Sequence, residues 1–353
     1  MCTPSEFVLP PPSAVTVHEQ AGALVVSLDF ELHWGVHDRR PLSARECSRL
    51  LAARAAIPRI LDVFEEFRIR ATWATVGLLF AKSRSEALNF TPNPKPTYLE
   101  SKLNPFYKQL GKDERDDPFH FAPSLISEIA SRPGQEIGSH SFSHYYCMEP
   151  GQTGEQFEAD LRSAIAIAAN SGHVLRSYVF ARNQVNSAYL PLIDRNGICC
   201  YRANENAEIK RPASFEEQQR FTYRIGRLLD AYMNICGPQT TGWPDGASAP
   251  IALCASRYLR PFHPAFAILQ PRQLSRICQA MERAAKHQEI FHLWFHPEDF
   301  APHVEANLRL LRQALEIFQL LHREHGMVSL SMSELPAKKK RTSNASTSYP
   351  HHA

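Results

Sequence analysis

Two acidic residues, Asp29 and Glu31, are placed where their side chains can share one site. They follow the apolar run 24–28, which has the composition of a buried β-strand, and one residue separates them. Because alternate residues of a strand point to the same side, both carboxylates are expected on one face at the end of this strand. Two buried carboxylates are costly unless a cation lies between them. The pair therefore predicts a metal site.

Two histidines supply further ligands of the right kind. His140 ends the predicted strand 135–140, and His144 lies four residues beyond it. Residues four apart meet on one face of a helical turn, which suits two imidazoles that bind one ion. This spacing is also common among surface and core histidines. Its position beyond a strand end, like that of Asp29 and Glu31, favours a shared metal site.

Other histidines show the same spacing. His33 and His37 follow the first strand and are expected at most to line the cleft, while His292 lies inside the predicted strand 290–296 and is expected in the core or behind the site. His296 ends that strand and therefore faces the same edge as the acidic pair. The acidic residues that follow it can orient its imidazole.

Arg182 ends another predicted strand, 177–181. An arginine in this position can simply close the sheet edge through an ion pair. It can also lie beside Asp29, where its guanidinium would keep the carboxylate ionised and fix its direction.

Alternating strand and helix patterns must position these residues. The apolar runs predict strands at 23–29, 70–76, 135–140, 177–181, 198–202, 251–256, 290–296 and 327–331. Helical patterns lie between them at 43–67, 123–131, 153–170, 187–196, 216–234, 271–288 and 302–324. Repeated strand–helix units predict a parallel sheet, and their number favours a closed or nearly closed barrel with its chemistry at the carboxyl ends of the strands.

Several segments do not follow this alternation of strands and helices. Residues 82–122 are rich in proline and charge and are expected to form an insertion, a lid or loop on the substrate side. Residues 236–250 predict a second long loop. The first 20 residues and the polar, basic tail 337–353 are expected to be disordered.

The ordered set of motifs resembles the NodB-type polysaccharide deacetylases, carbohydrate esterase family 4. The family's first motif matches Ser27–Glu31, in a variant with one residue between the acids, and its second strand matches 71–77. Its His-Ser/Thr-x-x-His motif matches His140–His144, and its arginine and terminal histidine motifs fall on Arg182 and His296. Gln184 stands where the family has a proline, and its fourth motif cannot be placed, which indicates a divergent branch.

This resemblance implies a distorted (β/α)7-type barrel over residues 21–336, with the insertion after the second strand. It also implies a divalent metal, most simply Zn²⁺, held by Glu31, His140 and His144. By the same resemblance Asp29 acts as general base, and Arg182 holds it. His296 then acts as general acid in removing N-acetyl groups from a sugar.

Charge and composition limit the remaining functions. The net charge of +3 is smaller than the four cations clustered at 338–341, so the rest of the chain carries −1 and gives no sign of a basic nucleic-acid surface. No apolar run reaches the roughly 18 residues that a membrane span needs. The sequence shows no secretory signal and no regular cysteine framework, so we expect a cytoplasmic protein.

A cytoplasmic location favours a nucleotide-linked or lipid-linked sugar, or an oligosaccharide, in the biosynthesis of a surface polysaccharide. Two alternatives stay open. One is a deformylase or cyclic-amide hydrolase on the same fold, and the other is a carbohydrate-binding barrel without catalysis. The oligomeric state is not indicated.

Overall fold

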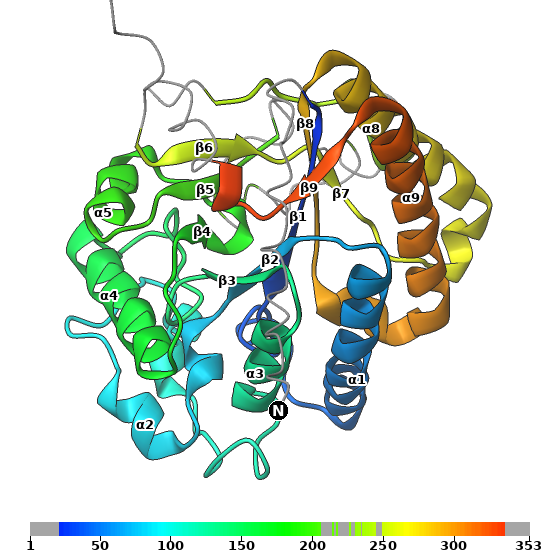
Figure 1. Ribbon diagram of the computed structural model, residues 1–353. Coiled ribbons are helices and arrows are strands. Elements are labelled where there is room, and N and C mark those ends of the chain that lie inside the picture. Colours follow the sequence, from blue (N-terminus) through cyan, green and yellow to red (C-terminus); the bar gives the residue numbers. More distant parts are fainter. Residues whose placement is uncertain are drawn as a thin grey trace, which may run out of the picture.

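The protein is built around one parallel β-sheet (Figure 1). The computed structural model describes residues 21–205, 214, 217, 226, 230–233, 235–244 and 249–335. The strands run in the order β6-β5-β4-β3-β2-β1-β8-β7, and β9 also pairs with β1. Their bounds are β1 Ala23–Phe30, β2 Ala71–Thr75, β3 Gln135–Ser139, β4 Ser177–Val179, β5 Cys200–Ala203, β6 Ile251–Cys254, β7 Arg257–Tyr258, β8 Ile290–Phe295 and β9 Val328–Leu330.

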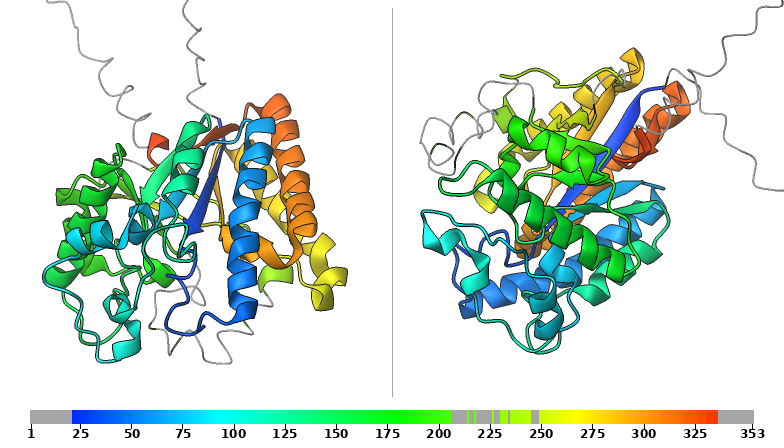
Figure 2. Two further views of the ribbon diagram at one scale, coloured as in Figure 1. Left: turned by 90° about the horizontal axis from the view of Figure 1, so that it is seen from below. Right: turned by 90° about the vertical axis from the view of Figure 1, so that its left-hand side faces the viewer.

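Helices cover the outside of this sheet, as both views of Figure 2 show. Some of them begin at residues whose side chains satisfy free backbone N–H groups: Ser43 caps α1, and Thr153 forms a capping box with Gln156 at the start of α4. The α-helices are α1 Ala44–Glu66, α2 Arg84–Asn89, α3 Pro123–Ser131, α4 Gly154–Asn170, α5 Leu190–Arg195, α8 Gln270–His287 and α9 Val304–His325.

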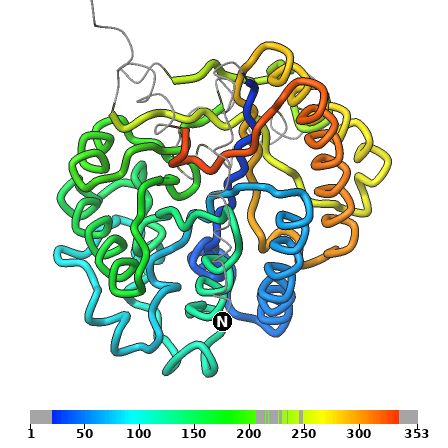
Figure 3. Tube along the Cα trace, in the orientation of Figure 1, coloured from blue at the N-terminus to red at the C-terminus, as the bar shows by residue number. Residues whose placement is uncertain are grey.

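Strand β1 lies at the centre of the sheet and is buried along its whole length. It pairs with β8 on one side, where Leu24 lies opposite Phe291. On its other side β9 pairs with its first residues and β2 pairs from Val26 onward. The first and last described strands therefore lie side by side, as the blue and red ends of the tube in Figure 3 show. This arrangement fixes the residues after β1 in the middle of the sheet edge.

The predicted fold class is confirmed. Among the described residues β6 and β7 are the two ends of the strand order, so the sheet is a curled half-barrel, a distorted form of the (β/α) barrel. The predicted strands all appear within a few residues of their predicted bounds. The sequence missed β7, because two residues are too short to show a period.

The insertion at 82–122 contains structure of its own. It includes α2 and two short 3₁₀ turns, η2 Ser101–Leu103 and η3 Pro105–Tyr107. The predicted disordered ends at 1–20 and 337–353 lie outside the described residues, as does most of the predicted helix 216–234. None of the helices in the described ranges has the length and apolar character required to cross a lipid bilayer.

Candidate active site

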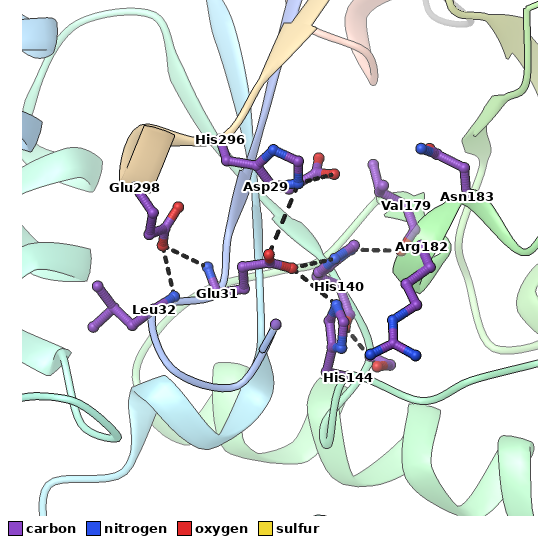
Figure 4. Close-up of polar contacts among 12 residues, drawn as sticks. Asp29, Glu31, Leu32, His140, His144, Val179, Arg182, Asn183, His296 and Glu298 are labelled. Atoms are coloured by element: carbon purple, nitrogen blue, oxygen red, sulfur yellow. Dashed lines mark hydrogen bonds and ion pairs between the residues drawn. The ribbon is translucent and has the colours of Figure 1, made fainter. Parts of the chain in front are cut away.

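The candidate site lies at the carboxyl ends of three strands. Asp29 is the penultimate residue of β1, and Glu31 follows its end. His140 follows β3, and His296 follows β8. In Figure 4 the Glu31 carboxylate lies between His296 on one side and the imidazoles of His140 and His144 on the other. The site is thus at the edge of the sheet where the strand pattern predicts chemistry.

The structure brings the three predicted metal ligands together. One atom from each of Glu31, His140 and His144 lies within 4.8 Å of the others. Glu31 Oε2 lies 2.8 Å from His144 Nε2 and 3.4 Å from His140 Nε2. The loop after β1 passes directly over this carboxylate, because a Cβ added at Gly35 would lie 2.0 Å from it. A side chain at this position would therefore displace the Glu31 carboxylate.

The hydrogen bonds of the triad fit a cation. His140 Nδ1 donates to the Val179 carbonyl oxygen at 2.9 Å, and this bond turns its buried Nε2 toward the Glu31 carboxylate. Burial lowers the pKa of His144 to about 4, although Glu31 opposes this shift, so His144 is neutral. Two imidazoles and one carboxylate are a ligand set of catalytic zinc sites.

Asp29 is paired with an arginine that the sequence did not predict. Arg202, on β5, reaches across the inside of the curled sheet, and its Nη1 and Nη2 donate to the two Asp29 carboxylate oxygens at 2.6 and 2.7 Å. Burial alone would raise the pKa of Asp29, but the charge of Arg202 holds it below the usual value. Arg202 also donates to Asn183 and stacks over the Trp294 ring. Asp29 is therefore a fixed, ionised carboxylate.

The prediction that Arg182 holds Asp29 is wrong. After β4 the backbone turns through left-handed residues, with φ of 54° at Arg182 and 53° at Asn183. The Arg182 guanidinium instead donates to both carboxylate oxygens of Asp38 at 2.6 Å, and it lies 4.1 Å from the centre of the Tyr146 ring. The turn replaces the straight strand end that the prediction assumed, so Arg182 ties the loop after β1 to the end of β4.

His296 has a carboxylate partner on the side away from the triad. Its Nδ1 lies 3.1 Å from Asp299 Oδ2, while its Nε2 lies 3.7 Å from Asp29 and 3.8 Å from Glu31. Burial alone would lower the pKa of His296, but the hydrogen bond and charge of Asp299, together with the other two carboxylates, raise it to about 10. His296 is therefore an imidazolium whose Nε2–H faces the carboxylates of Asp29 and Glu31.

The three other histidines considered in the sequence analysis, His33, His37 and His292, lie around this site. His292 is fully buried behind it and contacts the Ser27 hydroxyl, which also accepts from Arg202. His33 bonds to His120 of the insertion, and His37 stacks against Tyr146. The structure places none of the three in the ligand triad.

Sequence reasoning missed Arg202, Asn183 and the specific role of Asp299. Arg202 lies at the end of the predicted strand 198–202, just as Arg182 lies at the end of the predicted strand 177–181. The position of the arginine at a strand end therefore does not distinguish the two. Choosing between the two requires knowing how far the sheet curls, which a single sequence does not state. Asp299 was visible only as one of two acids after His296.

Comparison with known proteins agrees with this site. A family model described as "Polysaccharide deacetylase" matches residues 48–198, a range that includes both histidines of the triad. This match covers less than half of the chain, and it confirms the resemblance to the polysaccharide deacetylases that the motifs predict. No curated protein matches the chain by sequence.

Solved structures show the same fold at low identity. A Mycobacterium smegmatis protein described as a polysaccharide deacetylase is 13% identical, with a TM-score of 0.58 over 97% of this chain and 99% of that one. A Pseudomonas aeruginosa PAO1 protein with the same description is 12% identical, with a TM-score of 0.55 over 92% of each chain. An allantoinase is 11% identical, with a TM-score of 0.53 over 93% of each chain.

Proposed function

We propose that this protein is a metal-dependent hydrolase that removes the N-acetyl group from an amino sugar. One observation carries the proposal: three possible ligand atoms converge between a fixed carboxylate and an imidazolium. Glu31, His140 and His144 would hold the metal, with Zn²⁺ as the expected ion. When bound, such an ion lowers the pKa of water to about 7 and polarises the acyl oxygen.

Asp29 is the general base in this proposal. The Arg202 guanidinium keeps its carboxylate ionised at neutral pH and fixes its direction. It can therefore accept a proton from the water that attacks the acetyl carbon. A base that is already ionised and oriented spends no free energy on reaching that state during the reaction.

His296 is the general acid. Its Nδ1 is bonded to Asp299, so its Nε2–H is the proton available to the cleft. When the carbon–nitrogen bond breaks, this proton passes to the amine nitrogen. An amine leaves as a neutral molecule only if it is protonated, and a positioned acid contributes about 10²–10⁴-fold to such a step.

The substrate is proposed to be an N-acetylated amino sugar carried on a nucleotide, a lipid or an oligosaccharide. The match to the polysaccharide deacetylase family model supports a carbohydrate substrate.

The experiment is a product assay with purified protein, prepared without metal and then loaded with Zn²⁺. We expect acetate and a free amine from an N-acetyl sugar, in equal amounts, only in the zinc-loaded sample. Formate from an N-formyl sugar would instead identify a deformylase, and ring opening of a cyclic amide would identify the third activity. Metal-independent turnover would contradict the proposal.

A further inference from the structure

The two turns that carry the proposed ligands share an unusual backbone. Leu32, directly after Glu31, has a φ of 45°, and the turn from His140 to His144 has φ of 62° at Ser141 and 56° at His144. Left-handed residues other than glycine cost free energy, and they persist only where surrounding contacts hold them. Each ligand turn therefore requires an external support.

A buried carboxylate from another part of the chain holds each turn. Glu298 Oε1 accepts the backbone N–H of Leu32 at 2.6 Å and that of Glu31 at 3.1 Å. Asp160 Oδ1, on α4, accepts the N–H of Phe142 at 2.7 Å and that of Ser143 at 3.3 Å. In both turns one oxygen thus accepts two successive N–H groups.

These carboxylates are costly to keep where they are. Asp160 is fully buried and Glu298 is 4% exposed. Asp160 receives a third bond from the Ser143 hydroxyl, so its donors are backbone amides and a neutral side chain. Burial raises the pKa of Asp160 to about 6 despite these bonds. Hydrogen bonds to an ionised acceptor are roughly twice as strong as neutral ones, and such bonds would hold the turns tightly.

We propose that Asp160 and Glu298 are positioning residues that set the metal affinity of the site by holding the two ligand turns in their left-handed conformations. Neither is a ligand. The inference rests on the proposed metal-dependent function, since it concerns how the same ligands are presented. Partners that orient metal ligands typically contribute 10–100-fold in affinity.

The test measures Zn²⁺ affinity by competition with a chromogenic chelator, and folding of the metal-free protein by circular dichroism. Asp160→Ala and Glu298→Ala are each expected to weaken Zn²⁺ binding about 10–100-fold. Asp160→Asn is expected to restore most of the affinity. Its amide oxygen accepts the same two N–H groups, and its NH₂ group can donate to the Ser143 hydroxyl.

A carboxylate of the same helix gives the matched control. Glu158, two residues before Asp160, is paired with Arg195 away from the ligand turn. Glu158→Ala is expected to change thermal stability but not Zn²⁺ affinity. If Asp160→Ala does not fold, Glu298→Ala on the other turn carries the test.

The possible outcomes distinguish a failure of the positioning role from a failure of the proposed metal-dependent function. Wild-type protein that binds no Zn²⁺ would remove the proposed metal function itself. Wild-type protein that binds Zn²⁺, with folded alanine variants that bind it equally well, would overturn only the positioning role. An equal loss of affinity in Glu158→Ala would also overturn it, because the effect would then be a general loss of stability.

Discussion

The proposed base, Asp29, and the first proposed metal ligand, Glu31, lie two residues apart at the end of β1. Their negative charges are nevertheless balanced by different kinds of partner. Asp29 is neutralised by the Arg202 guanidinium, which contacts both of its oxygens. Glu31 faces the imidazoles of His140 and His144, whose Nε2 atoms lie 3.4 and 2.8 Å from its Oε2. The first pair is complete in the protein alone, whereas the proposed triad would be completed by a cation. We therefore treat the Asp29–Arg202 pair as the base half of the site and the triad as the metal half. A substitution in one half should impair its own function and leave that of the other half intact.

The largest expected effects come from removing one member of each half. Asp29→Asn should retain Zn²⁺ and lose nearly all turnover, because the base is gone while the ligands remain. His140→Ala should lose both metal and turnover. Zinc content by elemental analysis and acetate release measure the two outcomes. An Asp29→Asn protein without zinc, or full activity of His140→Ala after chelation, would contradict the separation.

Gly35→Ala should disable the triad without changing any ligand. The new Cβ would lie 2.0 Å from the Glu31 carboxylate and must displace it. We expect Zn²⁺ affinity to fall at least 10-fold, with turnover at saturating metal reduced less. Gly242→Ala is the control, because nothing lies within 4 Å of its added Cβ. Equal Zn²⁺ affinity in the two variants would show that the Glu31 carboxylate does not need this position.

Arg202→Gln should damage the base half alone. Without the guanidinium the buried Asp29 loses its counter-charge, so its pKa rises. The base works only when ionised, so the acidic limb of the rate profile should move to higher pH, and turnover at neutral pH should fall about 10²-fold or more.

Arg182→Gln provides the matched comparison, since Arg182 pairs with Asp38 rather than Asp29. Its acidic limb should stay where it is in the wild-type protein. A shift of that limb in Arg182→Gln, and none in Arg202→Gln, would restore the original sequence-based assignment.

The smallest effect is expected at Asp299→Asn. The hydrogen bond and charge of Asp299 raise the pKa of His296, which reaches about 10. The general acid works only when protonated, so activity is lost as the pH rises through this value. Removing the charge lowers the pKa, and the alkaline limb should therefore move to lower pH. An unchanged alkaline limb would show that another group donates the proton.

The sequence predicted the parts of the site that depend on local spacing. Glu31, His140 and His144 each directly follow a strand or lie within one turn of it, and the carboxyl ends of all strands in a parallel sheet lie at the same edge. Only β2 separates β1 from β3, so the three side chains are close enough to meet. Their role as ligands stays a prediction.

The rest depends on curvature and on backbone handedness. Arg202 reaches Asp29 only because the sheet curls until β5 faces β1, four strands away in the sheet order. Arg182 misses Asp29 because two residues after β4 are left-handed. No periodic pattern encodes either property. The same holds for Asp160 and Glu298, whose partners are backbone groups of distant turns.

The pairing of β1 with β9 has a mechanical consequence. The two strands are parallel and adjacent, so a pull on the start of β1 and the end of β9 would load their backbone bonds in shear. Shear strains several bonds at once, whereas an antiparallel hairpin pulled open from one end breaks them in succession. Strand β1, which contains Asp29 and ends directly before Glu31, would thus resist stretching, and the site at its far end would be shielded from force applied at its start.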